Sequence, residues 1–114
     1  MMIENIPFGV TDWAVLPAEE HRGETGTSFW RTVRRGDVRV RVVEYSAGFR
    51  SDHWCARGHV MLVLEGELVI ALRDGREFVL RSGMGFEAGD DEGNPHRVSS
   101  GAGARVFLVD RRDT

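Results

Sequence analysis

The stretch "HVMLVLEGELVIALRDGREFVL", residues 59–80, decides the fold of this 114-residue chain. Short runs of β-branched and other apolar residues alternate here with glycine-containing dipeptides that favour tight turns. The pattern predicts three strands joined by two turns. The strands are expected at about 59–64, 67–73 and 76–81, and the turns at Glu65-Gly66 and Asp74-Gly75. This arrangement is typical of an all-β protein.

Further strands are predicted on both sides of that stretch. In "DVRVRVV" the valines Val38, Val40 and Val42 alternate with Arg39 and Arg41, which is the period-two pattern of a strand with one buried face. Additional strands are expected at 28–35 and 105–110, and residues 11–21 fit either an edge strand or a single helical turn. Seven or more short strands in about 100 residues can bury their faces only as a sandwich or a barrel. A barrel of this size has room for one small ligand.

The composition is that of a single globular domain over residues 1–114. Hydrophobic residues make up 41% of the chain, and the net charge of −3 comes from interleaved acidic and basic residues. This charge pattern does not predict a basic patch that would bind nucleic acid. No run of the sequence approaches the ~18 consecutive apolar residues of a membrane helix. The start, "MMIENIPFGV", lacks a basic segment followed by a long apolar run, so we expect a cytoplasmic protein. A single cysteine cannot form an internal disulfide.

Potential metal ligands are concentrated just before and within the first predicted strand of the opening stretch. His53, Cys55 and His59 all occupy odd-numbered positions, as does the apolar Met61. Alternate residues of a strand point to the same face, so the parity of their numbers predicts that all three face the interior with Met61. His96 begins a later apolar stretch and is a candidate fourth ligand. A lone buried histidine or cysteine is usually an ordinary core residue. Several imidazoles buried together without a metal, however, leave many polar atoms without partners. Imidazole and thiolate together suit Zn²⁺, Fe²⁺, Ni²⁺ or copper.

The same positions resemble the cupin superfamily. The spacing of its first motif is filled here by His53, Cys55, His59 and Gly66, and its second motif is represented by His96. Cys55 stands where the family usually has a second histidine, and His59 where it usually has a glutamate; both replacements are competent ligands. The resemblance is closest to small cupins with an Asp-His-Cys-Trp signature. It implies a double-stranded β-helix, or jelly-roll barrel, with residues 38–110 as the barrel and 1–27 as an N-terminal extension packing on it.

The resemblance implies a divalent-metal site formed by His53, Cys55, His59 and His96, with zinc the first expectation and iron, nickel or copper as alternatives. We expect the protein to bind, or act on, a small molecule. Two alternatives stay open. One is a closed structural zinc site or a non-catalytic ligand-binding module, and the other is a three-histidine iron dioxygenase in which Cys55 is not a ligand. Enzymatic activity is therefore left open.

Residues around the cluster have weaker expectations. Asp52 is a candidate acceptor for an imidazole N–H, although a turn carboxylate is the commoner case. Arg41, Tyr45 and Arg50 are candidate contacts for an anionic substrate, although solvated arginines are commoner. His21 is expected at the surface. The aromatic residues are expected in the core or in a subunit contact; they are Trp13, Trp30, Trp54 and Phe86. A homodimer is predicted, because two-fold association is the commonest oligomer and covers edge strands.

Overall fold

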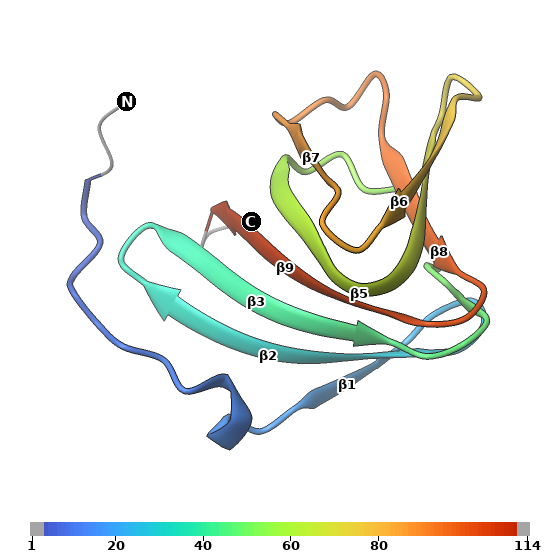
Figure 1. Cartoon of the computed structure of the whole chain (residues 1–114). Coiled ribbons are helices and arrows are strands. Elements are labelled where there is room, and N and C mark those ends of the chain that lie inside the picture. The colour runs from blue at the N-terminus through green and yellow to red at the C-terminus, as the bar shows by residue number, and fades with distance from the viewer. Residues whose placement is uncertain (1–3, 112–114) are drawn as a thin grey trace.

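A computed structural model describes residues 4–111, which form one antiparallel sheet curled into a half-barrel (Figure 1). The order of hydrogen-bonded strands is β1-β2-β3-β9-β5-β8-β4, and β6 and β7 also pair with β5. The fold is therefore all-β, as predicted. The strands are β1 (Glu19–Arg22), β2 (Thr27–Arg35), β3 (Val38–Tyr45), β4 (Phe49–Arg50), β5 (His59–Leu72), β6 (Glu77–Arg81), β7 (Gly85–Ala88), β8 (His96–Ser100) and β9 (Ala104–Arg111).

Strand β5 joins the two walls of the half-barrel. Its first half pairs with β7 and β9, and its second half pairs with β6 and β8. The predicted turn at Glu65-Gly66 is wrong: the chain continues as strand through both residues, with a register shift between Val63 and Glu65. Gly66 has a φ of 80°, which a glycine adopts without steric cost, so this position bends the strand instead of reversing it. The predicted turn at Asp74-Gly75 is confirmed.

The strand predicted over residues 38–42 is confirmed, but the prediction of a single buried face marked by the valines is wrong, because the inner face carries the arginines. Arg39 lies opposite Asp110 and Arg41 opposite Leu108 in the pairing of β3 with β9. The Arg41 residue is only 5% exposed, and Val42, on the other face, is buried as well. Covering of both faces of β3 explains why the pattern of valines alone did not indicate which face points inward.

The core lies between the two walls. It is formed by apolar residues from five strands and the short β4, which are Val43, Phe49, Met61, Val63, Leu68, Ile70, Leu80, Val98, Ala104, Val106 and Leu108. The segment that fitted either a strand or a helical turn contains both, because a 3₁₀ turn η1 (Trp13–Val15) precedes strand β1. The Trp13 ring meets Phe107 edge-on, with 6.4 Å between ring centroids. Within residues 4–111 no helix is long and apolar enough to cross a membrane.

Candidate metal centre

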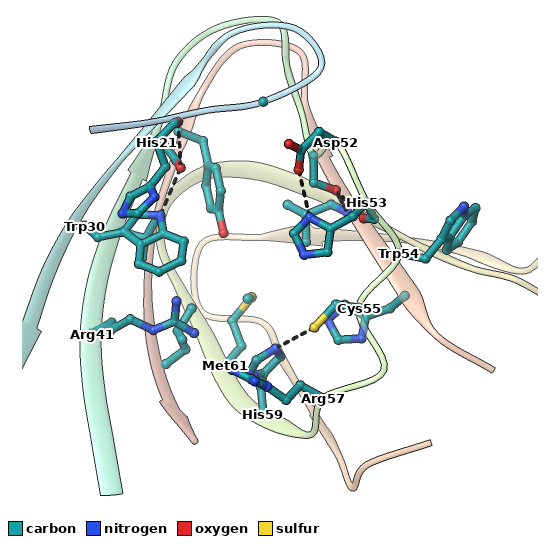
Figure 2. Close-up of a pocket in the computed structure, with 18 of the residues that line it drawn as sticks. His21, Trp30, Arg41, Asp52, His53, Trp54, Cys55, Arg57, His59 and Met61 are labelled. Carbon is teal, nitrogen blue, oxygen red and sulfur yellow. Dashed lines mark hydrogen bonds and ion pairs between the residues drawn. The ribbon is translucent and has the colours of Figure 1, made fainter. Parts of the chain in front are cut away.

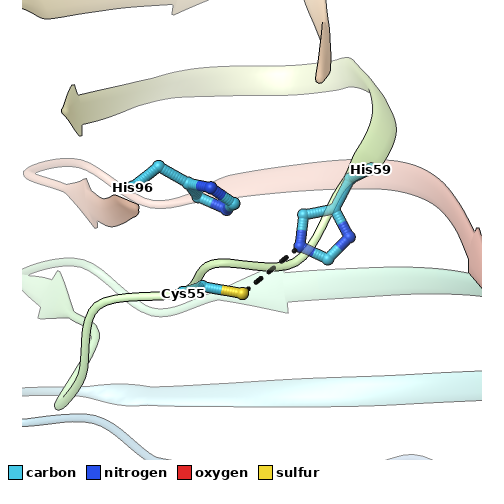
Figure 3. Close-up of side chains that lie close together, drawn as sticks. All are labelled: Cys55, His59 and His96. Atoms are coloured by element: carbon cyan, nitrogen blue, oxygen red, sulfur yellow. Dashed lines mark hydrogen bonds between the residues drawn. The ribbon is translucent and has the colours of Figure 1, made fainter. Parts of the chain in front are cut away.

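Three of the predicted ligands converge at one end of the half-barrel. One ligand atom from each of Cys55, His59 and His96 lies within 4.8 Å of the other two (Figure 3). Each residue comes from a different structural element: Cys55 from the loop before β5, His59 from the start of β5, and His96 from the start of β8. The backbones of Cys55 and His96 are joined by two hydrogen bonds of 2.7 and 2.9 Å, which fix the loop against β8. The two imidazoles are buried and the thiol is half-buried.

The orientation of the His59 ring is set by Asp110 of β9. His59 Nδ1 lies 2.9 Å from Asp110 Oδ2, and His59 Nε2 lies 3.7 Å from the Cys55 sulfur. A tetrahedral zinc with typical Zn–S and Zn–N bonds holds sulfur and nitrogen ligands about 3.6 Å apart. A carboxylate that accepts the other ring N–H is the usual companion of a metal-bound histidine. The distance and the ring orientation therefore both fit a metal between Cys55 and His59.

Asp110 is the centre of a buried ionic network. Its side chain is fully buried and accepts a bidentate pair of 2.8 Å hydrogen bonds from Arg39 and a third from Arg41 Nη2, also 2.8 Å. Burial by itself raises the pKa of this carboxyl, but the hydrogen bonds from Arg39 and His59 and the charge of Arg41 outweigh it and hold the pKa well below its usual range. Asp110 is therefore an anion at neutral pH and keeps the proton of His59 on Nδ1, leaving Nε2 to face the thiol.

The thiol and the imidazole perturb each other. Burial by itself raises the pKa of Cys55, but hydrogen bonds with His59 and His96 outweigh it and lower that pKa to about 5. Burial by itself lowers the pKa of His59, but hydrogen bonds with Asp110 and Cys55 outweigh it and raise that pKa. A thiolate is the form in which cysteine binds metals. At neutral pH Cys55 is therefore present as the thiolate, beside an imidazole whose pKa is raised.

His53, the fourth predicted ligand, is not brought into this cluster. Its side chain is 71% exposed, and its Nδ1 lies 2.7 Å from the Asp52 carboxylate. The prediction that His53 faces the interior required a regular strand through residues 53–59. The chain there is an irregular loop with a single bridge at Cys55. The predicted contact between Asp52 and an imidazole is present, but the imidazole is that of His53 at the rim (Figure 2).

The cluster lies in the wall of a cavity of about 790 Å³. Of the three residues expected to contact an anion, Arg41 and Tyr45 line this cavity, and Arg50 lies outside its lining. Burial raises the pKa of Tyr45 to about 12, so its phenol stays protonated. His21, expected at the surface, is half-buried, lines the cavity, and stacks on Trp30 with 3.9 Å between ring centroids.

The aromatic residues occupy different environments. Trp30 and Phe86 pack against the core, whereas Trp54 is partly exposed and lies 5.7 Å from the Arg97 guanidinium. Two site residues, Asp110 and Arg39, were missed by sequence reasoning. Val106, Leu108 and Asp110 are alternate residues of β9 and therefore point to the same face. Alternation along "RVFLVD" would thus have placed the Asp110 carboxylate on the inner face.

Comparison with solved structures identifies the fold. An RmlC-like cupin from Shewanella frigidimarina NCIMB 400 is 14% identical with a TM-score of 0.73, over 95% of this chain and 94% of that one. A cupin-superfamily sugar phosphate isomerase from Silicibacter pomeroyi is 18% identical with a TM-score of 0.65, over 85% of this chain and 69% of that one. The chain thus has the cupin fold, as its motifs predicted.

A third similar structure contains iron. Fe(II)-HppE, solved with an alternative substrate, is 14% identical with a TM-score of 0.71; the match covers 90% of this chain and 60% of that one. No protein-family model and no curated protein sequence matches the chain. At these low identities, the TM-scores of 0.65–0.73 establish the fold alone.

Proposed function

We propose that this protein binds one divalent transition metal through Cys55, His59 and His96 and uses the bound metal to bind or convert a small molecule. The observation that carries the proposal is the ordered arrangement of Asp110, His59 and Cys55. The carboxylate fixes the His59 tautomer, and the free nitrogen faces a thiolate at a distance that suits a shared metal.

The number of ligands favours an open site. Three protein donors converge among residues 4–111, and the fourth predicted donor, His53, lies at the rim. Structural zinc sites are closed by four protein ligands, whereas catalytic sites keep a position for water or substrate. A metal at this cluster would supply Lewis-acid chemistry at that open position. The adjacent cavity of about 790 Å³ is large enough for a small organic molecule.

Zinc is the metal that we propose first. One thiolate and two imidazoles form a donor set that occurs in catalytic zinc sites. Iron is the alternative, since one of the similar structures is that of Fe(II)-HppE. The three-histidine iron site would require His53 to leave Asp52 and join His59 and His96.

The test is metal content after purification without added metal and after reconstitution with zinc or iron. We expect one metal per chain in the wild type and a loss of at least tenfold in affinity for Cys55→Ser, His59→Ala and His96→Ala. His53→Ala is the matched control and should retain full metal. Full metal in folded His59→Ala and His96→Ala proteins would overturn the proposal. Loss of metal in His53→Ala would restore the four-ligand site predicted from the sequence.

A nucleophilic thiol is the second candidate function. Cys55, His59 and Asp110 stand in the order nucleophile, base and orienting carboxylate, which is an arrangement that activates cysteine for covalent chemistry. The two candidates differ in what the thiol does while metal is present. If the protein purifies without metal and cannot be reconstituted, the nucleophilic thiol becomes the leading explanation of the cluster.

A further inference from the structure

The cavity wall opposite the Cys55 loop carries more positive than negative charge. Arg39 and Arg41 project from neighbouring inward positions of β3, and both donate to the single carboxylate of Asp110. Arg39 takes both carboxylate oxygens in a bidentate pair, so Arg41 is left with one bond to an oxygen that is already shared. The guanidinium groups of the buried Arg41 and the partly buried Arg39 thus face one carboxylate. Burial of an uncompensated charge is costly unless a partner is supplied.

Arg41 is held in place, but one of its hydrogen-bond donors has no acceptor among the described residues. Its side chain is only 6% exposed, and its Nε has no hydrogen-bond partner within residues 4–111. The guanidinium carbon lies 4.5 Å from the centroid of the Trp30 ring, which packs against one face of the group. Burial lowers the pKa of Arg41, and Asp110 offsets this only in part. The side chain is therefore fixed, charged and able to accept a further anionic partner.

The position of Arg41 links it to the candidate metal centre. Asp110 Oδ2 accepts from Arg41 Nη2 at 2.8 Å and also contacts His59 Nδ1 at 2.9 Å, so the guanidinium and the imidazole lie on either side of one oxygen atom. Figure 2 shows the Arg41 side chain reaching into the cavity from the side opposite Cys55. Tyr45 lines the same cavity, and its buried phenol stays protonated as a further hydrogen-bond donor.

The rest of the cavity lining carries charges of both signs. Its carboxylates are Asp52, Asp90 and Glu92, and its other arginines are Arg22 and Arg57. Asp52 contacts His53, and Asp90 accepts the Gly58 N–H at 2.6 Å, so two of the three are already engaged by the loop that carries Cys55. Arg41 differs from Arg22 and Arg57 in being buried with an unpartnered Nε, so a single anionic group gains most beside Arg41 and away from the three carboxylates.

We infer that the cavity binds a small organic molecule through one oxyanion head group, a carboxylate or a phosphate, which Arg41 holds beside the Cys55–His59–His96 cluster. This assignment deepens the proposed function and rests on it for the role of the ligand as substrate. The binding of the head group itself requires only residues of this chain. Acetate and inorganic phosphate carry the two head-group chemistries in their simplest form and are the probes for the test.

The test is titration of the folded protein with acetate and with inorganic phosphate, both after chelation and after zinc loading, with sodium chloride as the control for ionic strength. Binding is read from two-dimensional NMR, including the Nε–H signal of Arg41, and from calorimetry. We expect saturable binding of at least one probe by the chelated protein, with a shift of the Arg41 signal. Tighter binding of acetate would assign a carboxylate, and tighter binding of phosphate would assign a phosphate. Hydrogen bonds to charged groups indicate that Arg41→Met should weaken binding on the order of tenfold or more.

Arg50→Met is the matched control, because Arg50 is an exposed arginine outside the cavity lining, and it should bind the probes like the wild type. If Arg41→Met does not fold, Arg41→Lys keeps the charge but loses the planar fork, and it should still weaken binding. Absence of saturable binding in the wild type, or equal binding by Arg41 variants and wild type, would overturn the inference. Metal content is measured on the same samples. Stoichiometric zinc without anion binding would refute only the anion site, and anion binding without metal would refute only the proposed metal function.

Discussion

Replacement of Asp110 by asparagine is expected to destabilise the protein and to weaken metal binding. The carboxylate receives three hydrogen bonds of 2.8 Å from two guanidinium groups and a contact of 2.9 Å from His59 Nδ1. Asparagine has nearly the same size, but it has no negative charge and only one acceptor oxygen. Its amide N–H₂ would face a guanidinium or the imidazole. The buried Arg41 and the partly buried Arg39 would then lack their counter-ion.

The magnitude follows from this network. Removal of one partner from a buried ion pair costs about 3–5 kcal/mol, because the remaining charge stays buried without compensation. Counting each charged hydrogen bond of Asp110 separately would give a larger figure, but relaxation of Arg39 and Arg41 and the remaining acceptor oxygen reduce it. We therefore expect a loss of about 3–5 kcal/mol in the free energy of unfolding at pH 7. Loss of the partner of His59 should also lower zinc affinity by about 10- to 100-fold.

Urea unfolding of the metal-free proteins measures the first effect, and competition with a chelator measures the second. Asp74→Asn is the matched control, because Asp74 also makes a multidentate contact with an arginine, Arg76, but both side chains are exposed. Its effect should be much smaller, since water screens that pair.

The folded-state pKa of Asp110 is lowered, so its contribution to stability is complete above the unfolded pKa of about 3.9 and is lost as the pH falls further. The difference between wild type and Asp110→Asn should therefore shrink below about pH 4. An effect no larger than that of Asp74→Asn, or one that persists undiminished at low pH, would refute the reasoning.

Other parts of the account give further predictions. Iodoacetamide should label Cys55, the only thiol in the chain, slowly in the zinc-loaded protein and rapidly after chelation. In the chelated protein the labelling rate should have its midpoint near pH 5, because the pKa of Cys55 is lowered to about 5. Equal rates in both forms would remove Cys55 from the ligand set. Gly66→Ala should lower the melting temperature more than Gly75→Ala. Both glycines have positive φ, but only at Gly66 would the added carbon meet a backbone oxygen, at 2.3 Å. Equal decreases in melting temperature would contradict the importance of this close approach. The homodimer predicted from the sequence should have a mass near twice 12.8 kDa in light scattering, and it would cover apolar residues such as Val60 and Leu62, which are 56% and 41% exposed on the outer face of β5. A monomer at micromolar concentration would contradict it.

The fold could be predicted from the sequence because alternation and glycine turns are local signals. The strands at 38–45 and 104–111 follow from period-two patterns, and the turn at Asp74-Gly75 follows from its residue types. The Glu65-Gly66 dipeptide has the same appearance, yet it bends one long strand. The choice between turn and bend depends on pairing with β9, which is a contact between distant parts of the chain.

The candidate site was predicted in part for the same reason. Parity within β5 correctly placed His59 on the inner face with Met61. Parity failed for His53, because residues 51–58 form a loop whose course is set by hydrogen bonds to β8 and to the acidic loop after β7. The interior position of Arg41 could not be deduced from β3, because both faces of that strand are covered and buried arginine is uncommon.

The coordination of the reconstituted metal tests the central claim most directly. X-ray absorption spectroscopy of the zinc-loaded wild type should show one sulfur at about 2.3 Å and two imidazole nitrogens at about 2.0–2.1 Å, with the remaining position filled by a light, exchangeable ligand. The sulfur should disappear in Cys55→Ser, while His53→Ala should leave the spectrum unchanged. A spectrum without sulfur, a third imidazole that is lost in His53→Ala, or a protein that retains no stoichiometric metal would contradict the account.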